Sequence, residues 1–320
     1  MKRARRLEPT AGGVAEAARL LRAGGLVAFA TETVYGLGAD ATSPEAVARI
    51  FAAKGRPSFN PLIAHVHDMQ TARREGAFSP LAEKLAEAFW PGPLTLVLPV
   101  APTARVCDLA RAGLDTIALR MPAHPVARSL LEQAGVPVAA PSANRSGRVS
   151  PASADHVLED LGETIDAVLD CGPAEVGVES TIVACVGDAP VLLRPGGVAR
   201  EAIEALVGKL AAASSGRIEA PGMLASHYAP RARVRLNATD LQSGEAGLDF
   251  AGRFAKSQGA LVLDLAPDGD PARAASNLYA FLRRLDASGV ASIAVAPVPQ
   301  AGLGEAINDR LQRAAAPRPA

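Results

Sequence analysis

The twelve residues Ala139-Ala-Pro-Ser-Ala-Asn-Arg-Ser-Gly-Arg-Val-Ser150 follow a short apolar run and precede a helix, and the rest of the chain is organised around them. They crowd serine hydroxyls, an amide and two guanidinium groups into one loop. Pro141 and Gly147 shape its backbone so that N–H groups can converge. Such a loop suits an anion with many oxygens, although this stretch alone fits a solvated loop with helix-capping serines equally well.

Length and charge limit what the chain can be. Its 320 residues exceed the usual size of one domain, which predicts two domains with well-buried cores. The formal net charge is zero, and this argues against bulk electrostatic attraction to nucleic acid or to a membrane surface. Any anion site must therefore be built locally.

The three cysteines, Cys107, Cys171 and Cys185, have neither a close pairing nor the spacing of a zinc site. A disulfide framework and a structural metal are therefore not indicated, and a reducing cytoplasm is the expected location. The basic start of the chain lacks the apolar core of a signal peptide, and charges and prolines interrupt every apolar run before it could cross a bilayer.

Hydrophobic periodicity predicts an α/β domain with a mixed sheet over residues 1–210. Strands are expected at 26–30, 62–66, 94–98, 116–121, 136–140, 165–169, 180–186 and 191–193, and helices at 14–23, 44–54, 80–89, 124–134 and 200–210. Ser43-Pro44 and Ser79-Pro80 each read as an N-cap followed by a proline in the first turn.

The second half of the chain begins with a linker at 211–231 that is rich in alanine, serine, glycine and proline. Beyond it, apolar strands near 232–236, 260–265 and 290–296 alternate with helices near 270–286 and 303–314. This pattern predicts a smaller three-layer α/β, Rossmann-like domain over 232–320.

The common catalytic signatures are absent: there is no Walker loop, no strand-borne G-x-G-x-x-G, no H-E-x-x-H, no G-x-S-x-G and no C-x-x-C. Another cationic segment, Lys54-Gly-Arg-Pro-Ser-Phe-Asn-Pro61, places two cations and an amide around a glycine at a helix end. Cations also stabilise a helix C-terminus without any ligand, so this segment alone does not decide between the two roles.

Lys54-x-Arg56 together with Ser142-x-Asn144 resembles the signature of the YrdC-like family, the threonylcarbamoyl-AMP synthases. Further matching segments appear in family order, namely Thr31-Glu-Thr-Val-Tyr-Gly-Leu37, Trp90-Pro-Gly-Pro-Leu-Thr95, Arg120-Met-Pro122, Glu179-Ser-Thr-Ile182 and Leu193-Arg-Pro-Gly196. Pro221-Gly-Met223, His227-Tyr-Ala-Pro230 and the final α/β region resemble the longer, two-domain form of the family.

The resemblance implies an ATP-dependent enzyme. It would join L-threonine, bicarbonate or CO₂, and ATP into threonylcarbamoyl-AMP, releasing pyrophosphate. The product serves the N6-threonylcarbamoyl modification of tRNA adenosine 37 and passes to a separate tRNA threonylcarbamoyl-transferase system, so direct tRNA binding is not required. Mg²⁺ is expected to accompany ATP without a dedicated protein ligand.

Residue types and the resemblance together assign the site. Both reacting partners are anions, so cations and N–H donors are the groups that the chemistry requires. Catalysis is assigned to Lys54, Arg56, Ser142 and Asn144; ATP binding to Arg56, Asn60, Thr116, Ser142, Ser150, Arg194 and Tyr228; and threonine binding to Thr33, His65, Arg120, Ala140 and Ser180.

Four of the assigned residues, His65, Lys54, Ser142 and Tyr228, carry explicit expectations. His65 lies in an apolar run, and without the resemblance this position favours a hydrogen-bonded core histidine over a ligand-binding one. Lys54 and Ser142 are expected on the surface of the site, so that alanine at either position should cost activity and little stability. Residues 221–230, with Tyr228, are expected to form a lid that excludes water from a hydrolysable mixed anhydride.

Two other functions fit parts of the sequence. A basic groove framed by Lys54, Arg56, Arg145 and Arg148 would suit an RNA-binding module without ATP turnover. A carbamoyl-adenylate enzyme of the hydrogenase-maturation type has a related domain within a much larger chain. The absence of accessory zinc-finger and acylphosphatase-like segments speaks against that alternative.

Overall fold

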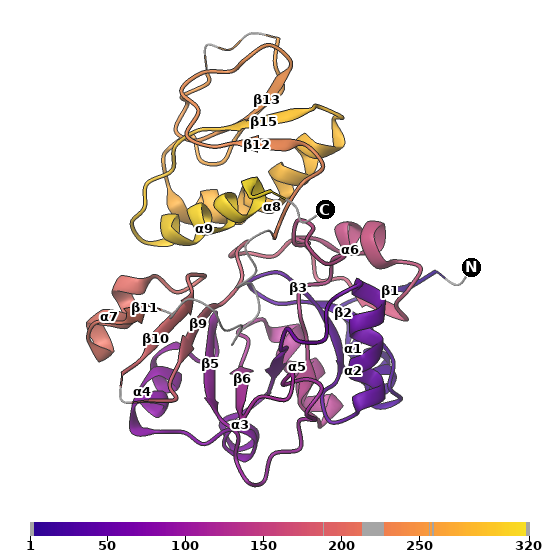
Figure 1. Cartoon of the computed structure of the whole chain (residues 1–320). Helices are drawn as coiled ribbons and strands as arrows, with labels where there is room; N and C mark the ends of the chain where they lie inside the picture. Colours follow the sequence, from indigo (N-terminus) through magenta and orange to yellow (C-terminus); the bar gives the residue numbers. More distant parts are fainter. Residues whose placement is uncertain (1–2, 188, 213–226, 256, 258, 318–320) are drawn as a thin grey trace.

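The computed structural model describes residues 3–187, 189–212, 227–255, 257 and 259–317, which form a large and a small α/β domain (Figure 1). In the described residues the large sheet has the strand order β1-β8-β2-β3-β7-β4-β6-β5-β9-β10-β11. Its strands are β1 (Arg5–Leu7), β2 (Val27–Ala30), β3 (Tyr35–Asp40), β4 (Ile63–His65), β5 (Leu94–Pro99), β6 (Thr116–Arg120), β7 (Val138–Ala139), β8 (Ala167–Leu169), β9 (Thr181–Ala184), β10 (Val191–Arg194) and β11 (Ala211–Ala212).

The pairing within this sheet is mixed, as the sequence predicts. Strand β4 runs parallel to β6 but antiparallel to β7, and β5 runs antiparallel to β6 but parallel to β9. The helices of the large domain are α1 (Ala11–Arg22), α2 (Pro44–Lys54), α3 (Met69–Glu75), α4 (Pro80–Phe89), α5 (Pro125–Ala134), α6 (Ala154–Leu161) and α7 (Arg200–Val207).

Two helix starts follow the predicted chemistry. The Ser43 and Ser79 side chains accept hydrogen bonds from the backbone N–H groups of Ala46 and Ala82, and a proline occupies the first turn of each helix. At its other end, α2 stops at Gly55, whose φ of 59° is the left-handed conformation that favours glycine. This ending points Lys54 and Arg56 toward the interior.

The small domain has a parallel sheet of strand order β12-β15-β13-β14. Its elements are β12 (Arg233–Arg235), β13 (Glu245–Asp249), β14 (Val262–Asp264), α8 (Pro271–Ala287), β15 (Ser292–Val295) and α9 (Leu303–Ala315). Both helices lie between this sheet and the large domain (Figure 1). The sequence-based prediction of three layers expects helices on both faces of this sheet, but among the described residues both helices cover the same face.

Strands β1, β3, β11 and β13 and helix α3 are absent from the sequence-based prediction, and β11 falls in the stretch predicted to be a linker. The glycine-rich end of the Thr31–Leu37 segment suggests a turn, whereas Tyr35–Asp40 is a buried strand. A Cβ atom at Gly38 would lie 2.8 Å from the ring of Phe29 on the neighbouring strand, so close packing inside the sheet requires this glycine.

No helix in the described part of the chain is long and apolar enough to cross a membrane.

Candidate functional site

A buried cavity of about 40 Å³ lies where several loops and strand ends of the large sheet meet the segment that precedes the small domain. Its wall includes all five residues assigned to threonine and four of those assigned to ATP. They are Thr33, His65, Arg120, Ala140 and Ser180, and Arg56, Ser142, Arg194 and Tyr228. The structure therefore gathers residues that are up to 195 positions apart in the sequence, between Thr33 and Tyr228.

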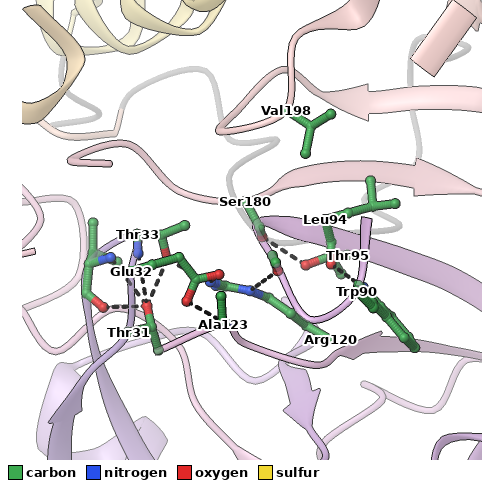
Figure 2. A network of polar contacts seen from close by, with 12 residues as sticks. Thr31, Glu32, Thr33, Trp90, Leu94, Thr95, Arg120, Ala123, Ser180 and Val198 are labelled. Carbon is green, nitrogen blue, oxygen red and sulfur yellow. Dashed lines mark hydrogen bonds and ion pairs between the residues drawn. The ribbon is translucent and has the colours of Figure 1, made fainter. Parts of the chain in front are cut away.

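Arg120, at the end of β6, is held in place by three groups, of which Figure 2 labels Glu32 and Thr33. Its Nη2 lies 2.8 Å from Glu32 Oε1, and its Nη1 donates to Thr33 Oγ1 at 2.9 Å. Its Nε donates to the Gly92 carbonyl at 3.3 Å. Burial would raise the pKa of Glu32, but the charge of Arg120 and the hydrogen bonds to the carboxylate together outweigh burial, and the pKa lies below its usual value. The pair fixes the plane of the guanidinium beside the cavity.

His65 ends the neighbouring strand β4, with its ring edge against Phe29 at a centroid distance of 6.4 Å. Burial, reinforced by the charge of Arg120, lowers the pKa of His65 to about 3, so the imidazole is neutral at physiological pH. Its Nδ1 is buried and has no hydrogen-bond partner among the described residues. One nitrogen of this buried ring is therefore left for a ligand that enters the cavity, whereas a fully hydrogen-bonded core histidine, the other interpretation of the sequence, would leave none.

Ser180 connects the cavity to two strands. Its Oγ lies 2.7 Å from Thr95 Oγ1, as Figure 2 shows, and Arg194 Nη2 donates to it at 3.2 Å. The same nitrogen donates to the Ser180 carbonyl at 2.8 Å. Burial lowers the pKa of Arg194. A hydroxyl and a guanidinium are therefore fixed together on the wall of the cavity that the loop 139–150 also lines.

Lys54 is not on the surface of the site, and this expectation from the sequence is wrong. The residue is only 3% exposed, and its Nζ donates to the carbonyls of Ser142 and Asn144, each at 2.5 Å. Burial lowers the pKa of this ammonium well below its usual value, and the nearby charge of Arg56 adds to the effect. Lys54 thus supports the loop from behind, because the helix ending at Gly55 turns its side chain under the backbone.

Arg56 is also buried but lines the cavity. Its Nη2 donates to the Pro61 carbonyl at 3.1 Å, while its Nε has no hydrogen-bond partner among the described residues. Burial lowers the pKa of Arg56 to about 10, which still leaves the guanidinium charged at neutral pH. Of the two cations in the Lys-x-Arg segment, Arg56 is the one that faces the space a ligand would use.

The structure does not place Lys54, Asn60, Thr116, Asn144 or Ser150 on the cavity wall. The Asn144 amide donates to two carbonyls of its own loop, and the Ser150 hydroxyl donates to Glu179 Oε1 at 2.6 Å. Thr116 is the first residue of β6, at the opposite end of that strand from Arg120. Asn60 is buried, and within the described part of the chain its Oδ1 has no hydrogen-bond partner.

Most of the predicted lid, residues 221–226, lies outside the described residues. The described remainder, 227–230, closes one side of the cavity: Tyr228 is 1% exposed and adopts a positive φ of 61°. The His227 ring lies edge-on to it with centroids 4.0 Å apart, and burial lowers the pKa of His227 to about 3. The Ala229 N–H donates to the Gly147 carbonyl at 2.9 Å, which latches this segment onto the loop 139–150.

Sequence reasoning missed several residues at the site. Glu32 and Glu179 stand inside the matched segments, each as an acidic residue next to one assigned to threonine, so their position was a usable signal. Tyr279 and Arg310 contact Glu179 from the small domain, where no local pattern marks them. The missed groups are those that hold the assigned residues in place.

The exposed basic groove of the RNA-binding alternative does not form. Lys54 and Arg56, two of its four cations, are buried, at 3% and 8% exposure. Arg145 donates through Nε to the Asp160 carbonyl. The cations therefore do not form one open surface along which phosphates could lie.

Comparison with known proteins agrees with this architecture. A family model described as "Telomere recombination" matches residues 19–196, and one described as "Threonylcarbamoyl-AMP synthase, C-terminal domain" matches residues 198–316. The threonylcarbamoyl-AMP synthase of Bacillus subtilis is 41% identical over 95% of this chain and 93% of its own length. That of Pyrococcus abyssi is 41% identical over 93% of this chain and 92% of its own length.

A solved structure shows the same arrangement of both domains. The crystal structure of P. abyssi Sua5 complexed with L-threonine superimposes with a TM-score of 0.89 at 40% identity, covering 97% of each chain. With a family model matching more than half of its residues, and relatives similar along almost its whole length, this chain belongs to the Sua5/YciO/YrdC family, in the form that carries the C-terminal domain of threonylcarbamoyl-AMP synthases.

Proposed function

We propose that this chain is an L-threonylcarbamoyladenylate synthase that uses ATP, L-threonine and bicarbonate or CO₂ and releases pyrophosphate. The observation that carries the proposal is the single buried cavity in which Arg120, Thr33 and Ser180 meet Arg56 and Arg194. The first three suit an amino acid with a hydroxyl group, and the last two suit a phosphate chain. The named activity of relatives that align along both domains supports the same reaction.

The threonine half of the site works by positioning. Arg120 presents a planar fork to the substrate carboxylate, and Glu32 keeps that fork from rotating. The hydroxyls of Thr33 and Ser180 are held by fixed partners, so they can direct hydrogen bonds at the amine or hydroxyl of the substrate. A neutral His65 adds an uncharged polar edge without repelling the ammonium group of free threonine.

The nucleotide half must overcome repulsion between anions. In the proposed reaction the threonine amine takes up CO₂ to give a carbamate. A carbamate oxygen then forms a bond to the α-phosphorus of ATP while the bond to the departing pyrophosphate breaks. Arg56 and Arg194 are charged and fixed beside the threonine residues, so they can neutralise both anions without reorganising.

We expect Mg²⁺ to enter on the phosphates of ATP and to supply further neutralisation of their charge. The acidic residues near the cavity suit this arrangement, because Glu32 and Glu179 are each occupied by an arginine. The described residues contain no group of three His, Cys, Asp or Glu side chains that could hold a metal ion by themselves.

The segment 227–230 separates the small cavity from a cleft of about 540 Å³ between the two domains. Tyr228 lines the cavity, whereas Ala229 and Pro230 line the cleft together with Gly147. A cavity of about 40 Å³ is far below the size of a nucleotide pocket, which is typically several hundred Å³. We propose that this segment moves aside when ATP enters and shuts water out when it returns, which is the role proposed for the lid.

The proposal also covers the fate of the product and the location of the protein in the cell. We expect the product to pass to a tRNA threonylcarbamoyl-transferase system, with no need for this chain to bind tRNA. The three thiols, all unpaired in the described residues, are compatible with the expected cytoplasmic location.

The test is pyrophosphate release by the purified chain with ATP, L-threonine and bicarbonate, and mass spectrometry of the adenylate formed. Omission of any one substrate should abolish release. Arg120→Lys keeps the charge but removes the fork, so it should raise the threonine KM far more than the ATP KM. Pyrophosphate release that is unchanged without threonine would refute the proposed reaction.

A further inference from the structure

Five buried side chains from both domains form one contact group around a carboxylate, which we call the Glu179 cluster. Glu179 Oε1 accepts from the Ser150 hydroxyl at 2.6 Å. Its Oε2 accepts from the Tyr279 hydroxyl and from Arg310 Nε, each at 2.7 Å. The Tyr279 ring stacks on Tyr228 with centroids 5.7 Å apart, and the guanidinium of Arg310 lies 5.2 Å from the centre of the Tyr228 ring.

The cluster forms part of the catalytic cavity. Glu179 and Tyr228 both line it, and Glu179 is bonded directly to Ser180 in the chain. Arg310 Nη2 also donates to the Pro195 carbonyl at 2.9 Å, one residue beyond Arg194. The guanidinium of Arg310 on helix α9 thus contacts Glu179, the neighbour of Ser180 in the threonine half, and Pro195, the neighbour of Arg194 in the nucleotide half.

Domain docking alone does not account for this arrangement. The domains are also joined by Arg283 and Asp160, which are largely buried at 12% and 4% exposure but lie outside the small cavity, and by Arg200 and Glu305, whose side chains are 34% and 27% exposed. Arg310, by contrast, is fully buried, and burying an ion pair is costly unless its geometry is good and its remaining hydrogen bonds are made. Partly exposed pairs would hold two domains together at a smaller cost in desolvation.

We propose that Arg310 and Tyr279 of the small domain are positioning residues for the reaction: they fix Glu179 and Tyr228, and through them set the places of Ser180 and of the segment 227–230. The small domain thereby completes the substrate cavity of the large one. This inference rests on the proposed synthase function for the identity of the substrates.

The electrostatics of the cluster agree with such a role. Burial alone would raise the pKa of Glu179, but the charges of Arg310 and Arg194 outweigh it and lower the pKa to about 2. The carboxylate therefore stays ionised and accepts its three hydrogen bonds throughout the physiological range. Without Arg310, a charged and incompletely neutralised carboxylate would remain next to the place where ATP and carbamate must bind.

The experiment compares Tyr279→Phe and Arg310→Lys with the control Glu305→Gln in the full-length chain. Tyr279→Phe removes one hydroxyl and keeps the ring stacking, and Arg310→Lys keeps the charge but removes the fork. Glu305→Gln breaks a docking pair on the same helix, α9, away from the cavity. Kinetics give kcat and the threonine KM separately, and thermal melting shows whether each variant folds.

We expect the threonine KM to rise by about tenfold or more in Tyr279→Phe and Arg310→Lys, the change that loss of one hydrogen bond to a charged group produces. Glu305→Gln should stay within about twofold of the unaltered chain, since exposed pairs contribute little. If activity fell equally in all three variants and in proportion to their melting temperatures, the cluster would serve only to hold the domains together, and the proposal would be refuted. Unchanged kinetics in Arg310→Lys and Tyr279→Phe would also overturn the proposal.

A second measurement separates this inference from the proposed reaction. Amide hydrogen exchange at 178–181 and 227–230 reports the positioning directly, without any substrate. Faster exchange there in Arg310→Lys than in Glu305→Gln supports the positioning role even if the unaltered chain makes no threonylcarbamoyl-AMP, and equal exchange refutes it. Absence of threonine-dependent pyrophosphate release in the unaltered chain would refute the proposed function alone.

Discussion

Replacing Lys54 by methionine should destabilise the large domain, although the position carries the family signature. The substitution keeps the length and most of the volume of the side chain, so it removes the two hydrogen bonds from Nζ to the Ser142 and Asn144 carbonyls without opening a large cavity. The bond to the Asn144 carbonyl is buried and the bond to the Ser142 carbonyl is partly buried, so water cannot easily replace the lost donor.

The size of the effect follows from these two bonds. A hydrogen bond to a charged group contributes about 1.5–3 kcal/mol, so losing both should lower the free energy of unfolding by about 3–6 kcal/mol. For a domain of this size, each kcal/mol lowers the melting temperature by about 2–4 °C. Even the smaller loss therefore lowers the transition of the large domain by about 6–12 °C.

The single tryptophan, Trp90, lies in the large domain and is mostly buried, so its fluorescence during urea unfolding reports that domain by itself. Ser142→Ala is the matched control, because its half-buried side chain lies on the cavity side of the same loop. It should lose activity while its unfolding free energy stays within about 0.5 kcal/mol. If Lys54→Met were as stable as Ser142→Ala, the role of Lys54 as a support of the loop would be refuted.

Three further outcomes are expected. Glu32→Gln leaves Arg120 buried without its counter-charge, so the free energy of unfolding should fall by about 3 kcal/mol or more. Threonine binding measured by calorimetry should also weaken, and unweakened binding would show that Glu32 does not orient the guanidinium of Arg120. The pKa of Glu179 is about 2 in the folded chain against a usual 4.5, so this carboxylate contributes roughly 3 kcal/mol to the free energy of unfolding. The contribution is complete above pH 4.5 and is lost as the pH falls toward 2. Urea unfolding of Glu179→Gln should lack this dependence of the free energy on pH. Gly177→Ala puts a Cβ 2.3 Å from a backbone oxygen of α8, whereas the Cβ of Gly172→Ala, at a similar positive φ, meets nothing within 4 Å. The melting temperature should therefore fall clearly further in Gly177→Ala than in Gly172→Ala. Equal falls would mean that backbone strain alone acts at both positions.

The fold was predictable where local chemistry decides it. Serine caps followed by proline located the starts of α2 and α4, and long apolar runs located most of the strands. The sequence-based prediction failed at β3 and β13, because Gly36-Leu-Gly38 and Glu245–Asp249 lack the alternation of an ordinary strand. Their place in the middle of a sheet comes from long-range packing, which a local pattern does not contain.

The candidate site was predictable for groups that face the cavity and poorly predictable for groups that support it. Arg120 and Ser180 lie at strand ends next to recognisable motifs. The role of Lys54 was misjudged because a cation beside a glycine looks the same in sequence whether it faces a ligand or a carbonyl. Arg310 was missed because its partner, Glu179, is 131 positions away, and only the docking of the two domains brings them together.

The charges around the cavity show how a protein with zero net charge could hold the two anions that the proposed function requires. Three arginines and one glutamate line the cavity, and the two histidines on its wall are neutral. Arg310 neutralises the glutamate from behind, so the wall that faces a ligand is dominated by guanidinium groups. Burial lowers the pKa of Arg56 and of Arg194, which means that their charges are held at an energetic cost in the absence of a ligand. A triphosphate or a carbamate would relieve that cost on binding, so the fold supplies locally the attraction that its overall composition lacks.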